Sequence, residues 1–147
     1  MLVTKAEIAN MIPHSGAMCL LDGVVQWDKT TIRCVSQTHQ DENNPMRSNG
    51  QLPALCGIEY AAQAMAVHGA LSGLVGAKPR AGYLANLRDV VCRVSRLDNL
   101  ASDLIVDATQ VMGDDSLAIY QFSLHAGEVE LLAGRATVVL DAGGETV

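Results

Sequence analysis

The sequence contains few aromatic residues and few charges. It has one Phe, one Trp and three Tyr among 147 residues, and charged residues make up 18%, whereas hydrophobic residues make up 49%. With so few rings available, the core must be filled by Leu, Val, Ile and Ala. The formal net charge of −6 argues against nonspecific binding to DNA or to an anionic membrane. We therefore expect neither a nucleic-acid partner nor a membrane partner.

Long apolar runs, secretion signals and paired cysteines are also missing. No segment reaches the roughly 18 apolar residues that a membrane-spanning helix needs, and residues 1–12 lack a basic-then-apolar signal pattern. The cysteines, Cys19, Cys34, Cys56 and Cys92, form no Cys-x-x-Cys pair, which disfavours a zinc site or a disulfide framework. We expect a cytoplasmic protein with reduced, packed thiols, and neither a metal nor a cofactor.

The order of local patterns predicts one α+β domain over residues 1–147. Thr4 with Glu7 three residues later is a capping box, and Pro53 suits the first turn of a helix. Residues rich in β-branched side chains between turn formers predict the strands. The expected elements are a short helix at 4–12, strands at 17–28 and 30–39, a loop at 40–52, a helix at 53–74, and strands at 82–96, 102–112, 117–126 and 128–141.

Turn formers and prolines predict where these elements bend or end. We expect a turn near Asp28 and Lys29, a bulge at Gly23, a bend near Asn86 and a hairpin around Gly127. The long helix is expected to stop at "GAKP" (76–79).

The helix at 53–74 is apolar on nearly every side, so it must be buried on nearly every side. A curved antiparallel sheet wrapped around this one helix achieves such burial. The predicted architecture is therefore α+β and hot-dog-like. Because a lone sheet of this kind leaves free edges and an open flank, we expect a dimer.

One carboxylate, Glu59, stands in this apolar helix and is the strongest candidate for chemistry. His68 follows nine positions later, about 900° around the helix, so the two side chains face opposite sides. Gln63 lies on the same face as Glu59, one turn on. An acid in an apolar setting suits general acid/base catalysis. The alternative is a structural ion pair with Arg88 or Arg93 across the sheet.

The histidines are weaker candidates. His39 ends a predicted strand and opens the long loop, from which it can swing towards Glu59; the alternative is a solvated residue at the end of the loop. His14, in a turn, and His125, near a hairpin end, are expected to be surface residues or hydrogen-bonded turn residues. His68 is expected to be a hydrogen-bonded helix residue, at a subunit contact in one interpretation.

The chain resembles a known family along nearly its whole length. "MIPHSGAMCLLDGVV" (11–25), a polar loop and the "IEYAAQAMA" helix (58–66) resemble the hot-dog 3-hydroxyacyl-acyl carrier protein dehydratases. Those enzymes carry a similar Leu-Pro-His…Leu-x-Asp opening, and a Pro-Gly turn before a helix with Glu-Ala-Met-Ala-Gln. The matching positions here are Glu59, Ala62 and Gln63 in the helix and Pro53 in the turn. Residues 95–100 and 130–140 correspond to that family's Gly-Asp-x-Leu turn and final strand.

Two departures from that pattern point to a branch of the family. The family's catalytic histidine lies fourteen residues before the helix glutamate, and the same count from Glu59 reaches Pro45. The glycine after the turn proline is replaced by Ala54. This variant loop is similar to that of the divergent ApeP-like branch, which is linked to aryl-polyene biosynthesis.

The resemblance implies a function and a set of roles. The reaction would be dehydration of a 3-hydroxyacyl thioester, carried by acyl carrier protein or coenzyme A, in fatty-acid or aryl-polyene biosynthesis. Glu59 would be the general acid/base, His39 the assisting histidine, and Gln63 an orienting group. Backbone N–H groups near Ala54 and Leu55 would polarise the thioester carbonyl. The site would be shared across a homodimer or a heterodimer of hot-dog chains.

Two other functions stay open. A hot-dog acyl thioesterase would use Glu59 to activate a water for attack on the same thioester. A non-catalytic subunit would pair with a complete dehydratase, in keeping with the missing motif histidine. The basic residues between positions 78 and 96 are either solvated strand charges or a local patch for an acidic partner; they are Lys78, Arg80, Arg88, Arg93 and Arg96.

Overall fold

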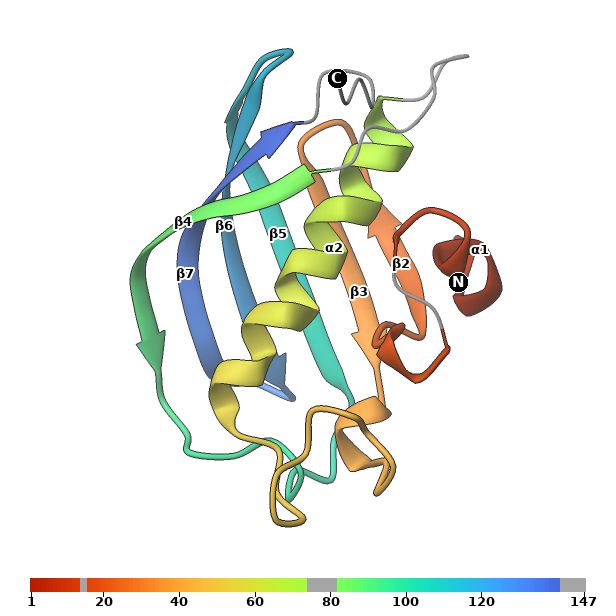
Figure 1. Cartoon of the computed structure of the whole chain (residues 1–147), viewed down its shortest axis with the longest axis vertical. Coiled ribbons are helices and arrows are strands. Elements are labelled where there is room, and N and C mark those ends of the chain that lie inside the picture. The colour runs from red at the N-terminus through yellow and green to blue at the C-terminus, as the bar shows by residue number, and fades with distance from the viewer. Residues whose placement is uncertain (14–15, 74–81, 141–147) are drawn as a thin grey trace, which may run out of the picture.

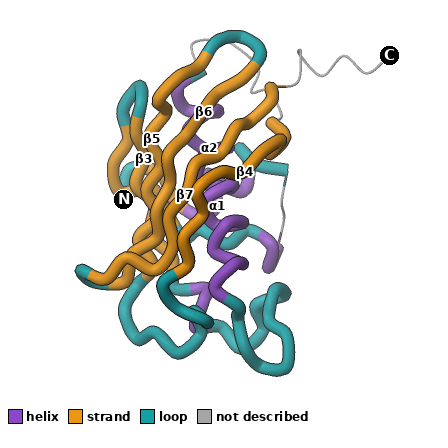
Figure 2. Tube along the Cα trace, turned by 90° about the vertical axis from the view of Figure 1, so that its left-hand side faces the viewer, coloured by secondary structure: helices purple, strands orange, loops and turns teal. Residues whose placement is uncertain are grey.

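The computed structural model describes residues 1–13, 16–73 and 82–140. Its elements are β1 (Val3–Thr4), α1 (Lys5–Ala9), η1 (Gly16–Met18), β2 (Gly23–Trp27), β3 (Thr31–Ser36), η2 (Thr38–Gln40), η3 (Ala54–Cys56), α2 (Gly57–Ser72), β4 (Gly82–Cys92), β5 (Leu104–Gly113), β6 (Leu117–Ala126) and β7 (Val129–Leu140). The strands form one antiparallel sheet in the order β1-β2-β3-β5-β6-β7-β4. This sheet curves around α2 (Figures 1 and 2), which confirms the predicted α+β architecture.

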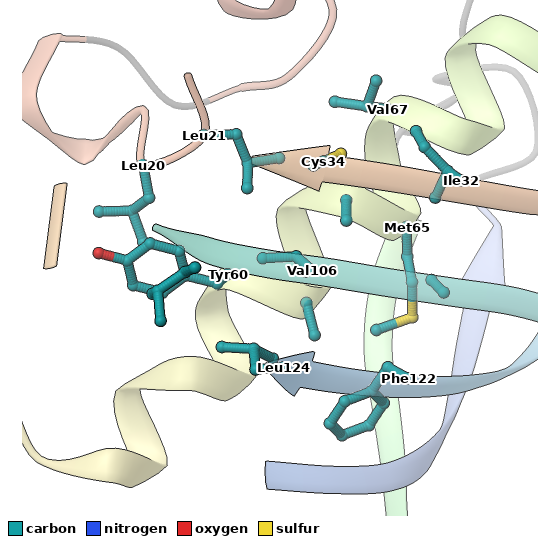
Figure 3. Packing of buried hydrophobic residues seen from close by; sticks show 14 of the residues in the cluster. Leu20, Leu21, Ile32, Cys34, Tyr60, Met65, Val67, Val106, Phe122 and Leu124 are labelled. Atoms are coloured by element: carbon teal, nitrogen blue, oxygen red, sulfur yellow. The ribbon is translucent and has the colours of Figure 1, made fainter. Parts of the chain in front are cut away.

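α2 is the centre of the core. Ten of its sixteen residues are buried, and its side chains lie against β3, β5 and β6. Tyr60 and Met65 belong to the same apolar cluster as Val106 and Phe122 (Figure 3). At Gly57, a Cβ atom would lie 2.9 Å from the terminal methyl groups of two leucines of the sheet. The first turn of α2 therefore rests directly on the sheet.

The chain just before α2 is held by the segment that follows β4. The Leu52 N–H donates to the Asp98 carboxylate at 2.8 Å, and the Leu97 N–H donates to the Leu52 carbonyl at 2.8 Å. The Ala54 N–H donates to the Ser95 carbonyl at 3.1 Å. These bonds explain why β4 ends at Cys92 rather than at residue 96, since the chain beyond it turns to pair with residues 52–54.

The predicted turns are largely confirmed. Asp28 Oδ1 accepts hydrogen bonds from the N–H groups of Thr30 and Thr31 and so closes the β2–β3 hairpin. Gly127 closes the β6–β7 hairpin with a φ of +60°, a conformation that favours glycine. The register of β4 shifts between Leu84 and Asn86, at the predicted bend.

The predicted bulge at Gly23 is wrong. The register shift in β2 lies between Val24 and Gln26 instead. Gly23 serves packing, because a Cβ atom there would lie 1.8 Å from the Met1 sulfur and 3.1 Å from the Val3 carbonyl oxygen. Glycine at this position thus leaves room for the Met1 side chain and for the close approach of β1.

The helix boundaries differ from the predicted ones. α1 has the expected capping box, in which the Glu7 N–H donates to Thr4 Oγ1 and the Thr4 N–H donates to Glu7 Oε1, but it ends at Ala9 rather than at residue 12. α2 ends at Ser72, where the Gly73 N–H donates to the Gly69 carbonyl. The expected stop at 76–79 lies outside the described residues.

All four cysteines are free. Cys19 and Cys34 are buried, as expected of thiols packed as small apolar side chains, and burial raises the pKa of Cys34 to about 12. Cys56 is only partly buried, and Cys92 is exposed because it ends the edge strand β4. The expectation that every thiol is packed is therefore wrong for Cys92.

Candidate active site

Glu59 lies in the first turn of α2 and is partly buried. Unsatisfied N–H groups and the helix dipole favour a carboxylate at this end of a helix. The helix leaves one stripe towards solvent, on which Leu55, Ala66 and Gly69 are exposed and Ala62 is partly buried. These positions recur at intervals of three and four residues with Glu59, so they share one face. Glu59 is the one acidic side chain of this stripe.

Gln63 lies one turn further along α2 and is fully buried. Its side-chain carbonyl accepts a hydrogen bond from the Leu20 N–H at 2.9 Å, and its NH₂ group donates to the Met18 carbonyl at 2.7 Å. The segment that leaves η1 is thereby bound to the helix beside Glu59. Both polar atoms of Gln63 form hydrogen bonds within the chain. Its expected role as a group that orients the substrate stays a prediction.

A buried polar cluster that the sequence reasoning missed surrounds the hydroxyl of Tyr60. Asn44 Nδ2 donates to Tyr60 Oη at 3.1 Å, and Thr38 Oγ1 lies 2.7 Å from the same oxygen. Thr38 Oγ1 and Ser36 Oγ both donate to the Leu20 carbonyl. Burial is the largest cause that raises the pKa of Tyr60. Since a buried tyrosine hydroxyl needs a partner, Tyr60 itself was the available signal.

His39 is fully buried rather than solvated at the end of the loop. Its Nε2 lies 3.2 Å from the Leu100 carbonyl oxygen and 2.9 Å from that of Ser102, so this nitrogen carries the proton and donates. Its Nδ1 has no hydrogen-bond partner, and therefore neither ring nitrogen binds the Glu59 carboxylate. Desolvation lowers the pKa of His39. The structure thus makes His39 an anchor between its loop and the segment before β5.

The backbone groups expected to polarise a thioester lie at the start of the helical segment η3–α2. The Ala54 N–H is occupied, because it donates to Ser95. Leu55 is 61% exposed and lies in the first turn of η3, where helical N–H groups have no partner within the helix. Of the two predicted positions, Leu55 is the one with a side chain at the surface beside Glu59.

His68 faces away from Glu59, as the helical spacing predicts. Its Nε2 donates to the Asp28 carbonyl at 3.0 Å, so its Nδ1 accepts from the Tyr120 hydroxyl at 2.7 Å. The two rings meet edge to face. The expected satisfied helix histidine is confirmed, and desolvation lowers its pKa. His14 lies outside the described residues.

These two buried histidines predict loss of stability in mild acid. Their pKa values are lowered in the folded state, so the unfolded chain takes up protons near pH 6.5 while the folded chain does not. The free energy of unfolding should therefore be highest above pH 7 and should fall from about pH 6.5 towards pH 5. Each histidine contributes a fall of at most about 1.4 kcal/mol for each pH unit. Urea unfolding at pH 7.5, 6.5 and 5.5 measures this fall.

The control for this prediction is His68→Gln, which removes one of the two titrating groups. Its stability curve should be flatter between pH 6.5 and 5.5 than that of the wild type. Carboxylates with lowered pKa, such as Asp28 and Asp114, begin to contribute only at lower pH, near their unfolded value of about 4. An equally steep curve in the variant would contradict the assignment to His68.

The basic residues near β4 are partly neutralised. Arg93 pairs with Glu130 at 3.0 Å, and Arg96 pairs with Asp98. Lys78 and Arg80 lie outside the described residues. Within the described part of the chain, no three His, Cys, Asp or Glu side chains are grouped as metal ligands, and no helix is long and apolar enough to cross a membrane.

Solved structures of known proteins match this fold over most of the chain. The dehydratase heterocomplex ApeI:P from Xenorhabdus doucetiae matches with a TM-score of 0.77 and 22% identity, covering 91% of this chain and 90% of that one. A Haemophilus influenzae thioesterase matches with a TM-score of 0.68 and 12% identity, covering 99% and 98%. Zebra fish thioesterase superfamily member 2 gives 0.64 and 13%, covering 93% and 95%. At these identities the likeness establishes the hot-dog fold alone.

Sequence comparison establishes the family. Curated protein sequences gave no match. The profile of the ApeP-like family, described as ApeP dehydratase, matches residues 6–144. That range spans nearly the whole chain and contains the helix with Glu59 and Gln63, together with the polar loop before it. The protein is therefore a dehydratase-like hot-dog protein that belongs to the ApeP-like family.

Proposed function

We propose that this protein takes part in the dehydration of a 3-hydroxyacyl thioester, carried by acyl carrier protein or coenzyme A, to a trans-2-enoyl thioester. The placement of Glu59 carries the proposal: it is the one acid on the solvent-facing stripe of an otherwise apolar helix. A partly buried carboxylate at such a position is suited to move a proton to or from a bound substrate. Membership in the ApeP-like family supports the same reaction.

In the proposed reaction, a base removes the α-proton of the substrate and Glu59 protonates the 3-hydroxyl group. The C–O bond breaks, water leaves, and a double bond forms between the α and β carbons. Negative charge that develops on the thioester oxygen is stabilised by N–H groups at the start of the helical segment, with Leu55 as the candidate donor. The thioester itself stays intact.

The base is proposed to come from a second hot-dog chain. His39 is buried and held by backbone carbonyls, which does not favour it as the base. β4 is the last strand of the sheet and exposes Leu84, Leu87 and Val91, so its free edge favours pairing with another chain. The similar structure from Xenorhabdus doucetiae is a dehydratase heterocomplex, which supports a partner chain for this protein as well.

A second candidate is a subunit without turnover of its own. The burial of His39 favours this alternative, since its Nε2 is held by the backbone carbonyls of Leu100 and Ser102. Such a chain would complete or stabilise a second hot-dog chain that carries the full set of catalytic groups.

The experiment is an assay with a 3-hydroxyacyl thioester of acyl carrier protein. The chain is tested alone and after co-expression with a hot-dog dehydratase that retains the motif histidine. Mass spectrometry detects the enoyl product, and a thiol reagent detects released carrier thiol. Enoyl product from the chain alone supports the dehydratase, and product only from the co-expressed pair supports the subunit. Release of free thiol without enoyl product would instead show a thioesterase.

A further inference from the structure

The side chain of Gln63 is oriented by its partners without ambiguity. The Leu20 N–H can only donate and the Met18 carbonyl can only accept, so the amide oxygen and NH₂ group of Gln63 have one possible arrangement. The side chain is 0% exposed, and both of its polar groups are engaged. Gln63 therefore presents no exposed atom to a substrate.

The residue that Gln63 holds is tied to α2 a second time. The Leu20 N–H donates to Gln63, while its carbonyl accepts from Thr38 Oγ1 at 2.8 Å. Thr38 Oγ1 in turn lies 2.7 Å from the Tyr60 hydroxyl. Leu20 also packs beside the Tyr60 ring (Figure 3). Together with the turn of α2 between Tyr60 and Gln63, these hydrogen bonds form a closed network through Leu20 and Thr38.

This hydrogen-bonded network includes Tyr60, the residue that directly follows Glu59 in α2. Side chains four residues apart on a helix have Cβ atoms about 6 Å from each other, and Gln63, one turn after Glu59, binds the backbone of Met18 and Leu20. The segment is therefore held against α2 close to the turn that carries Glu59. Its position depends on a side chain that is itself fully buried.

We propose that Gln63 is a positioning residue, which holds the segment 18–20 as a wall of the Glu59 site. This inference rests on the proposed function, in which Glu59 meets the substrate. It replaces a direct role of Gln63 on the thioester with an indirect one. A leucine at position 63 would keep the volume but lose both hydrogen bonds, whereas a glutamate would keep an acceptor for Leu20 and lose the donor for Met18.

The test compares Gln63→Leu with His68→Leu, a matched control on the same helix. Both changes remove a buried side chain with two hydrogen bonds, but His68 faces away from Glu59. Each variant is purified with any partner needed for activity, and its melting temperature, kcat and KM are measured. Gln63→Leu should lower kcat at least tenfold at a temperature where it is folded, with Gln63→Glu intermediate. His68→Leu should stay within twofold of the wild type.

A second measurement does not need turnover. Glu59 is modified with a water-soluble carbodiimide and glycine ethyl ester, and its labelling rate is followed by peptide mass spectrometry. Release of the segment 18–20 should raise this rate at least threefold in Gln63→Leu but not in His68→Leu. If the wild type does not dehydrate the thioester and this difference is still seen, the positioning role stands and the proposed function fails. Equal labelling in the two variants, or equal kcat in an active protein, overturns the positioning role.

Discussion

Replacing Glu59 by glutamine is expected to lower the rate of 3-hydroxyacyl thioester dehydration by a factor of about 10²–10⁴, the usual contribution of a general acid or base. Glutamine keeps the size of the side chain and its carbonyl oxygen but cannot take up or release a proton in the pH range of the assay. The position in the first turn of α2 should tolerate the change, since the residue is only partly buried. The enoyl product is quantified for wild type and variant at equal protein concentration.

A matched acid-to-amide change separates this effect from a change of net charge. Glu128 is exposed in the turn between β6 and β7, and Glu128→Gln should leave the rate unchanged. Melting curves of both variants establish that each is folded during the assay. An active wild type whose rate is not altered by Glu59→Gln would remove Glu59 from the reaction and, with it, the central support for the proposed function.

Replacing Tyr60 by alanine is expected to cause the largest loss of stability among the changes considered. Tyr60 is 0% exposed and lies in the apolar cluster between α2, Leu20 and the sheet. Loss of a buried aromatic side chain costs about 3–5 kcal/mol because of lost burial and the cavity left behind. The change also removes the partner that its hydroxyl offers to Thr38 and Asn44. Urea unfolding measures the difference in free energy.

Tyr60→Phe isolates the hydroxyl from the ring. Phenylalanine keeps the packing, so this variant should lose only about 1–3 kcal/mol, the typical net value of the two hydrogen bonds to Thr38 and Asn44. Asn44 retains its second bond, from Nδ2 to the Thr38 carbonyl, which limits the cost. A loss in Tyr60→Phe as large as in Tyr60→Ala would contradict this division and would make the polar cluster, rather than ring packing, the main contribution of Tyr60.

The fold follows from patterns that are local in the sequence. An apolar helix with few charges and several strands rich in β-branched residues leave a wrapped helix as the arrangement that buries both. Turn residues such as Asp28 and Gly127 act within two or three positions, so their effects were predictable. The sequence-based prediction was wrong where a residue is constrained by a contact with a distant segment of the chain. Gly23 leaves room for Met1 and for the Val3 carbonyl, and no local pattern carries that information.

The candidate site, too, has features that follow from local sequence spacing and features that depend on long-range contacts. The sequence by itself determined that Glu59 is the one acid of an apolar helix, that Gln63 shares its face and that His68 does not, because helical periodicity relates positions a few residues apart. Only the tertiary structure decided what these residues meet. The partners of Gln63 lie 43 and 45 positions away, and those of His39 lie 61 and 63 positions away. Such contacts depend on how the whole chain packs, and they make Gln63 a support and His39 an anchor.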